Sequence, residues 1–295
     1  PGHAGAMSEH ELGAFLRSRR ERLRPADVGL PDSGRRRTPG LRREEVAALA
    51  GVSIDYLVRL EQGRDRNPSA SVVLALANAL QLDTDERLHL TTLAQCSSAT
   101  QLCPIVEDAV ASEVSEGTLA VMDRLAPSPA VLLGPWYDVL AHNGPWGALM
   151  GSLGVLDRLP ANLAAFTFLD PRARAAYPRW AAVADEQVAV LRDAAVRWSV
   201  DERFQALLEE LQAEPEFSAR WDAHQVARKH RGEKVIVHPA AGELRITYEV
   251  LRVDEVAERR MIVWLPADAR TEEAFRRLTA PEEPVSPARL RVVGD

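Results

Sequence analysis

Residues 41–63, LRREEVAALAGVSIDYLVRLEQG, constrain the fold of this chain more than any other segment. Apolar side chains recur at helical spacing on both sides of a small-residue turn, which predicts two short helices that each bury one face. Gly51 suits the end of the first helix because glycine adopts positive φ without steric cost, and Ser53 suits the cap of the second. Such a pair predicts a helix-turn-helix unit, whose second helix enters the major groove of DNA. The predicted buried positions are Val46, Ala47, Leu49, Tyr56, Leu57 and Leu60.

The neighbouring segments help to decide between DNA binding and an ordinary helical domain, in which two adjoining amphipathic helices also occur. Helical periodicity over residues 12–24, 71–82 and 84–93 adds three helices and predicts a five-helix domain. With EVAALAGVSIDYLVRLEQG across its second and third helices, this domain resembles the Xre/Cro-like helix-turn-helix regulators. The resemblance implies a double-stranded DNA operator as partner. A single recognition helix reads few base pairs, so we also expect a homodimer.

The resemblance also implies roles for residues within the motif. Ile54, Asp55 and Arg59 fall on positions that relatives use for base edges, whereas Arg43 and Ser53 are better placed for phosphate. The loop at residues 25–40 carries an arginine triplet that is either a solvated charge run or an arm on the DNA. We favour the arm, because the triplet leads directly into the motif. The predicted DNA contacts are Arg35, Arg36, Arg37, Arg42, Arg43, Ser53, Ile54, Asp55, Arg59, Arg64 and Arg66.

The charge distribution agrees with one DNA-facing domain. Residues 11–66 contain thirteen arginines and nine acidic residues, a net charge of about +4, whereas the residues from 67 onward carry about −10 within a chain total of −7. No apolar run approaches the roughly 18 to 20 residues of a membrane span, so we expect a cytoplasmic protein with no membrane partner. The first seven residues, PGHAGAM, look like vector-derived sequence and are left out of the predicted domains.

At 295 residues the chain has room for one further domain of ordinary size. We predict a helix-turn-helix domain at residues 8–95, a helical connector at 96–126 that can also serve in dimerisation, and a second domain at 127–280. Strands followed by helices and then by further strands predict an α+β fold for the second domain. A β-hairpin is expected at residues 130–133 and 137–141, helices at 161–168, 172–177, 179–200 and 204–214, and strands at 234–238, 243–253 and 260–265.

The second domain carries a resemblance of its own. PSPAVLLGPWYDVLAHN, NLAAFTFLDP, YPRW and HPAAGELRITYEVL together look like the ligand-binding domain of the MmyB-like transcription regulators. A departure is His142, where relatives tend to have tryptophan. The resemblance implies a PAS-like sensor domain for a small apolar ligand, with fatty acids as the class to test. The predicted ligand contacts are Trp136, His142, Asn143, Trp146, Phe166, Trp180 and Tyr248.

The residues alone leave alternatives open. These aromatic side chains either pack in a core, which is the simpler interpretation, or line an apolar cavity. No Walker loop, GxSxG, GxGxxG, CxxC or HExxH motif is present, so we expect no enzymatic activity, no cofactor and no metal site. Cys96 and Cys103 are seven residues apart, about 10 Å along a regular helix, and are interpreted as free thiols. The alternative to a sensor is a second domain that only dimerises or contacts other proteins.

Overall fold

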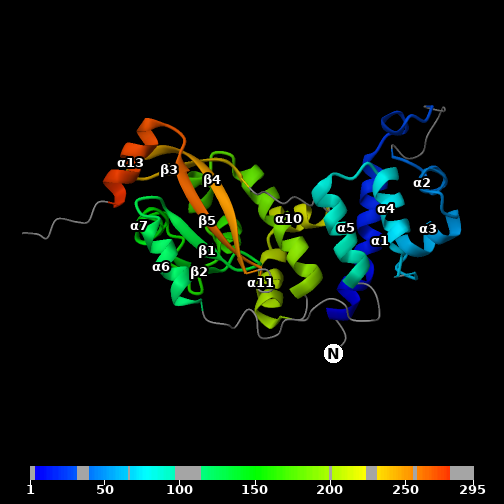
Figure 1. The fold of residues 1–295 in the computed structure, drawn as a ribbon, viewed down its shortest axis with the longest axis horizontal. Helices are drawn as coiled ribbons and strands as arrows, with labels where there is room; N and C mark the ends of the chain where they lie inside the picture. Colours follow the sequence, from blue (N-terminus) through cyan, green and yellow to red (C-terminus); the bar gives the residue numbers. More distant parts are fainter. Residues whose placement is uncertain are drawn as a thin grey trace, which may run out of the picture.

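The computed structural model describes residues 4–31, 40–65, 67–96, 114–198, 201–223, 231–254 and 258–279. A helical N-terminal part is followed by helices combined with one antiparallel sheet, which confirms the predicted α+β fold (Figure 1). Within these ranges, no helix is long and apolar enough to cross a membrane. The N-terminal helices are α1 (Ala4–Arg22), α2 (Arg43–Ala50), α3 (Ile54–Glu61), α4 (Ala70–Ala79) and α5 (Thr84–Cys96), with a short 3-10 helix η1 (Pro25–Val28) after α1.

The turn between α2 and α3 has the predicted local chemistry. Gly51 is left-handed, with a φ of 66°, and ends α2. Ser53 caps α3, because its Oγ accepts a hydrogen bond from the backbone N–H of Tyr56 at 3.1 Å. The two helices are therefore joined by the short capped turn that a helix-turn-helix unit needs.

The core of the N-terminal part is formed by side chains from all five α-helices. The buried arc of α2 consists of Val46, Ala47 and Ala50. The prediction that Leu49 is buried is wrong: this side chain is 41% exposed, because it lies on the flank of that arc. Gly13 lets α1 approach α3 closely, since a Cβ at this position would lie 2.5 Å from a backbone carbonyl oxygen of α3.

The second part of the chain is built on a five-stranded antiparallel sheet in the order β2-β1-β5-β4-β3. The predicted hairpin and the three later strands are confirmed. The strands are β1 (Ala130–Leu133), β2 (Val139–His142), β3 (Arg231–His238), β4 (Gly242–Asp254) and β5 (Arg259–Pro266).

Helices precede, separate and follow these strands. They are α6 (Glu116–Arg124), α7 (Gly144–Gly151), α8 (Leu163–Leu169), α9 (Arg172–Ala176), α10 (Trp180–Trp198), α11 (Glu202–Gln212), α12 (Pro215–Asp222) and α13 (Ala269–Thr279). The prediction missed α7, α12 and α13. Glycines and a proline give α7 a poor helical propensity, but Asn143 caps it and Trp146, Leu149 and Met150 are buried along it.

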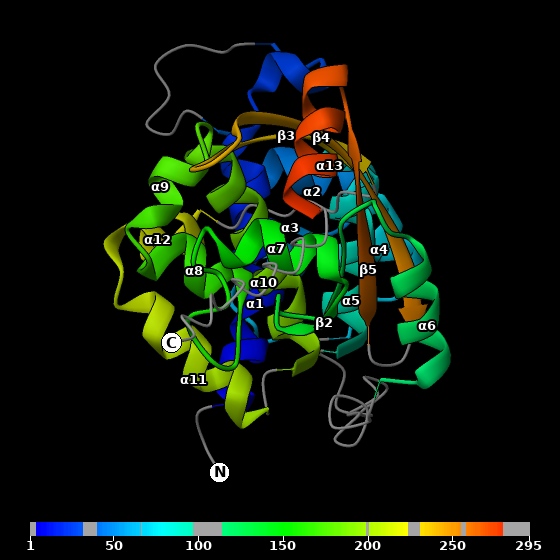
Figure 2. The same cartoon turned by 90° about the vertical axis from the view of Figure 1, so that its left-hand side faces the viewer.

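The sheet is covered on both faces (Figure 2). On one face, Met122 of α6 packs in a small cluster with Leu132 of β1 and Met261 of β5. On the other face, Tyr248 of β4 stands directly opposite Trp264 of β5, and both belong to the large core that includes α10. Because α10 also contacts α5, it lies between the sheet and the helix-turn-helix part (Figure 1).

Candidate functional site

The outer face of α3 carries the side chains predicted to read base edges. Ile54 is 49% exposed, Asp55 is exposed, and the Arg59 side chain is 49% exposed. The Arg59 guanidinium lies 5.6 Å from the centre of the Tyr56 ring and 3.8 Å from the Asp65 carboxylate. In Figure 1, α3 lies at the end of the molecule remote from the sheet, so nothing in the described chain covers this face.

A buried carboxylate fixes α3 against its neighbours. The Glu61 side chain is 1% exposed, and its two oxygens accept hydrogen bonds at 2.7 Å from Nε of Arg20 on α1 and from Nε of Arg43 on α2. The Arg20 side chain is 9% exposed, so the pair that it forms with Glu61 is buried, and leaving either of these two charges unpaired is costly. This pairing therefore orients the recognition helix.

Three of the other predicted DNA contacts have structural partners within the N-terminal part. Arg43 engages Glu61, Ser53 caps α3, and the Arg42 guanidinium lies 3.3 Å from the Glu44 carboxylate. Arg64 is exposed just after α3. Arg35, Arg36, Arg37 and Arg66 lie outside the described residues, as does Cys103, so the DNA arm and the cysteine interpretation stay predictions.

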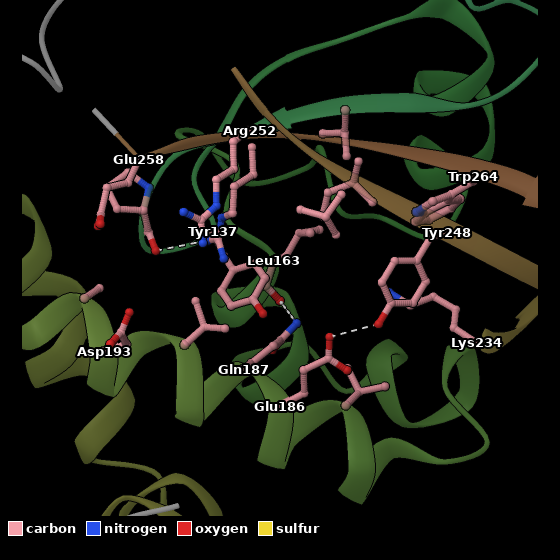
Figure 3. A pocket seen from close by; sticks show the side chains of 18 of the residues that line it. Tyr137, Leu163, Glu186, Gln187, Asp193, Lys234, Tyr248, Arg252, Glu258 and Trp264 are labelled. Carbon is pink, nitrogen blue, oxygen red and sulfur yellow. Dashed lines mark hydrogen bonds between the residues drawn. The ribbon is translucent and has the colours of Figure 1, made fainter. Parts of the chain in front are cut away.

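A cavity of about 140 Å³ lies between α10 and the inner face of the sheet (Figure 3). Apolar side chains supply part of its wall, including Val190 and Ala194 of α10, Val250 of β4 and Ile262 of β5. Trp264 and Tyr248 stand at one end, with the ammonium of Lys234 about 5.5 Å from each ring (Figure 3). This volume is close to that of cavities that accept benzene, and it is smaller than a typical ligand pocket of about 300 Å³ or more.

Polar groups interrupt the apolar wall at its middle. Tyr137, Tyr177 and Gln187 are at most 7% exposed, and all three line the cavity. Burial raises the pKa of the Tyr137 and Tyr177 hydroxyls far above the usual range of a phenol, so both stay protonated at neutral pH. The Gln187 amide nitrogen donates to the backbone carbonyl of Leu163 at 3.4 Å.

The opposite end of the cavity is cationic. Arg252 of β4 and Arg260 of β5 are direct cross-strand partners, and both side chains line the cavity. Arg260 donates to the neutral carbonyls of Gly134 and Pro135 at 3.3 and 3.2 Å, and its guanidinium lies 5.4 Å from the centre of the Tyr137 ring. Like charges that face each other across strands repel, so this pair favours an anion between or beside its guanidinium groups.

A third arginine at this end is already neutralised. Arg197 of α10 lies 2.7 Å from the Glu258 carboxylate and 3.0 Å from that of Asp193. Glu258 also accepts a hydrogen bond from the indole of Trp198 at 3.0 Å. The cationic character of this end therefore rests on the Arg252 and Arg260 pair.

Of the seven predicted ligand contacts, Tyr248 alone lines this cavity. Trp136 packs against Trp198 and Phe204. Asn143 uses its side chain to cap α7 and to bond the backbone of Ala130, Ser128 and Met122. The remaining four belong to aromatic contacts of the domain: His142 with Trp146, Phe166 with Tyr177, and Trp180 with Phe168. These six have structural roles here, and any ligand contact by them stays a prediction.

Sequence reasoning missed most of the polar lining, although a signal was present. The inward positions of β4 alternate through Ile246, Tyr248, Val250 and Arg252, so an arginine continues an otherwise apolar face. On α10, Gln187 and Asp193 interrupt an apolar face at helical spacing. A polar residue at a position that the periodicity marks as inward-facing was therefore the available sign of a site.

The cavity wall also contacts the helix-turn-helix part. Asp193, which lines the cavity, lies 3.2 Å from Nδ1 of His89 on α5, and the His89 side chain is fully buried. The neighbouring Arg192 lies 2.8 Å from Glu11 of α1, and Val196 packs in the N-terminal core. One helix therefore lines the cavity and contacts the helix-turn-helix part, on α1 and α5.

Comparisons with known proteins agree with this two-part organisation. A family model described as the ligand-binding domain of MmyB-like transcription regulators matches residues 114–278, more than half of the chain. The chain belongs to the MmyB-like transcription regulators. A helix-turn-helix domain model matches residues 11–90 of this regulator. A comparison with curated proteins found no match. The MmyB-like regulator is thus a DNA-binding transcription regulator with a ligand-binding domain.

Proposed function

We propose that this chain couples two binding events: an Xre/Cro-type helix-turn-helix domain binds the operator, and a PAS-like domain binds a small amphipathic acid. Fatty acids are the first ligand class to test. The observation that carries the proposal is the double role of α10, which lines the cavity and bonds His89 through Asp193. A helix that contacts both the cavity and the DNA-binding domain offers a physical link between the two domains. We further propose that the chain acts by binding alone, without catalysis and in the cytoplasm.

The chemistry of the cavity supports an acidic ligand. Arg252 and Arg260 supply cationic groups at one end, and apolar side chains such as Val250 and Ile262 supply a surface for a carbon skeleton. A carboxylate can accept charge-assisted hydrogen bonds from a guanidinium group, which are about twice as strong as neutral ones. The cavity volume of about 140 Å³ favours a short or medium chain.

The same volume suggests how binding reaches the DNA-binding domain. A ligand larger than the cavity must separate α10 from the sheet, and any shift of α10 acts on Asp193, Arg192 and Val196 together. The shifted and the unshifted arrangement of α10 then differ in their affinity for the ligand. The ligand can change operator affinity by no more than this difference.

The PAS-like assignment is supported by the antiparallel sheet with order β2-β1-β5-β4-β3 and by the helices inserted between β2 and β3.

Assembly as a homodimer through the connector and the second domain is also part of the proposal. Two recognition helices at half-sites about 34 Å apart supply the sequence information that one α3 lacks. Light scattering of the free protein and of its operator complex tests this; a monomer in both states would exclude it.

The sensor proposal is tested by titrating operator binding with saturated acids of increasing chain length. We expect a shift of about 5- to 150-fold in operator affinity for the best acid. The shift should be lost in R252A/R260A, while R245A, on the outward-facing side of β4, keeps it. If no acid shifts operator affinity or binds the protein, the second domain serves only dimerisation or protein contacts.

A further inference from the structure

The sheet presents three successive cross-strand pairs of side chains to the cavity, and the three pairs differ in chemistry. In the pairing of β4 with β5, they are Arg252 with Arg260, Val250 with Ile262, and Tyr248 with Trp264. Each pair is two residues from the next along both strands, which is about 7 Å. The wall of the cavity therefore changes from cationic to aliphatic to aromatic over about 14 Å.

Exposure to solvent falls in the same direction. On β4, Arg252 is exposed, Val250 is half-buried and Tyr248 is buried. On β5, Arg260 is half-buried and Trp264 is buried. Figure 3 shows Tyr248 and Trp264 at the end of the cavity away from Arg252. Burying a charge is costly, so an acid lies with its carboxylate at the exposed arginine end and its carbon skeleton toward the aromatic pair.

The charges at the aromatic end favour the same orientation. The Lys234 ammonium lies 5.4 Å from the centre of the Tyr248 ring and 5.5 Å from that of the Trp264 ring. The Tyr248 hydroxyl donates a hydrogen bond at 3.3 Å to the Glu186 carboxylate, which lines the same end. This carboxylate offsets the charge of Lys234 and repels a ligand carboxylate. The aromatic end therefore suits an uncharged part of the ligand.

An aromatic ring on the ligand matches this end better than an alkyl chain does. Aromatic rings attract one another in offset and edge-to-face arrangements, beyond the effect of the area that they bury. A ligand ring also offers its negative face to the Lys234 ammonium, which an alkyl group cannot do. For the same number of carbon atoms, a skeleton with a ring has fewer rotatable bonds to immobilise in the cavity.

We propose that the ligand is an arylalkanoic acid. Its carboxylate lies at the pair of Arg252 and Arg260, its aliphatic spacer crosses the middle pair, and its ring packs at the pair of Tyr248 and Trp264. This inference rests on the proposed function, because it assumes that the cavity is the ligand site. It narrows the ligand class from amphipathic acids in general, since a plain fatty acid matches the cationic and the aliphatic pair but not the aromatic one.

The test compares phenylhexanoic acid, cyclohexylhexanoic acid and dodecanoic acid, which have equal numbers of carbon atoms and carry any ring at the end of the chain. Their binding to the full chain is measured by isothermal titration calorimetry. We expect the phenyl acid to bind about fivefold more tightly than either of the others. Y248L should reduce this preference to about twofold or less. The control F168L removes a ring that packs on Trp180 and Phe217, outside the cavity wall, and should keep the preference.

Three results would overturn the inference. If the phenyl acid binds the wild-type chain no more than about twofold more tightly than the other two acids, the ligand class is wrong while the sensor function stands. If Y248L keeps the full preference, the ring does not pack at the aromatic pair. If none of the acids binds, the proposed function fails together with the inference. The wild-type series decides the ligand class even if Y248L does not fold.

Discussion

The hydrogen bond between His89 and Asp193 offers a direct test of communication between the two domains. The His89 side chain is fully buried, the Asp193 side chain is 11% exposed, and Nδ1 lies 3.2 Å from Oδ1. A hydrogen bond to a charged group contributes about 1.5 to 3 kcal/mol, and the long distance favours the lower value. We therefore expect a coupling energy of about 1.5 kcal/mol between the two side chains.

A double-mutant cycle isolates this energy. H89A also removes the edge contact between His89 and Phe15, whose ring centres are 5.1 Å apart, so its effect on stability alone is not specific. The cycle of wild type, H89A, D193N and the double variant cancels such losses. Operator affinity is measured by fluorescence anisotropy for each protein, with and without a saturating acid that shifts the wild type.

The expected result is a ligand-induced shift in operator affinity that falls by about tenfold in both single variants and no further in the double variant. The control is D185N, because Asp185 lies on the same helix and pairs with Arg220 at 2.8 Å but is 45% exposed. An exposed ion pair contributes little energy, so D185N should keep the full ligand-induced shift in operator affinity. A full ligand-induced shift in both H89A and D193N would refute the proposed route through α10.

Four further perturbations test the DNA interface and the electrostatics of the fold. R59A should cost about 1 to 3 kcal/mol in operator binding and relax specificity at one base pair, and an unchanged preference across operator variants would exclude base readout by Arg59. Alanine at Arg35, Arg36 and Arg37 should weaken specific and random DNA binding alike and lower the slope of log affinity against log salt by about 0.9 per lost contact, whereas an unaltered slope would mean that the triplet is only a solvated loop. E61Q should destabilise the N-terminal domain by about 3 to 5 kcal/mol, because Arg20 and Arg43 lose their buried partner; a thermal unfolding curve that matches the wild type would contradict this. Burial raises the pKa of Asp138 to about 6, so the folded state holds a proton that the unfolded state releases near its usual pKa of 3.8, and the free energy of unfolding should fall as pH rises from about 4 to 6. D138N should remove this dependence and be more stable than wild type by about 1 to 2 kcal/mol at pH 7.5 but not at pH 4, as checked by urea unfolding at the two pH values.

The sequence predicts most helices and strands because their apolar periods are strong. The helix-turn-helix unit needs only local chemistry, a glycine that takes positive φ and a serine that caps, and both act within a few residues. The helix α13 was missed although its pattern is helical. Its inward side chains are Thr271, Ala274, Phe275 and Leu278, which recur at i, i+3, i+4 and i+7 within a charged stretch.

The ligand cavity is harder to predict because its wall is assembled from distant segments. The large aromatic residues chosen from the sequence are buried, but burial alone does not say whether a side chain faces a cavity or another ring. Trp136 and Trp146 face other aromatic rings. Arg252 and Arg260 become neighbours only when β4 and β5 pair in the observed register. For two consecutive antiparallel strands this register depends on the strand ends and on the length of the connection, which the apolar pattern alone did not fix.

The structure also limits how strongly a ligand can act on DNA binding. Arg192, Asp193 and Val196 of α10 contact the N-terminal part. Arg192 is held in place by Trp221 of α12, whose ring its guanidinium covers at 4.4 Å, and Val196 is buried in the N-terminal core. Asp193 is the one of the three that lines the cavity, so a ligand acts on it first. Because the hydrogen bond from His89 contributes at most about 3 kcal/mol, regulation through this contact alone cannot exceed about 150-fold in operator affinity.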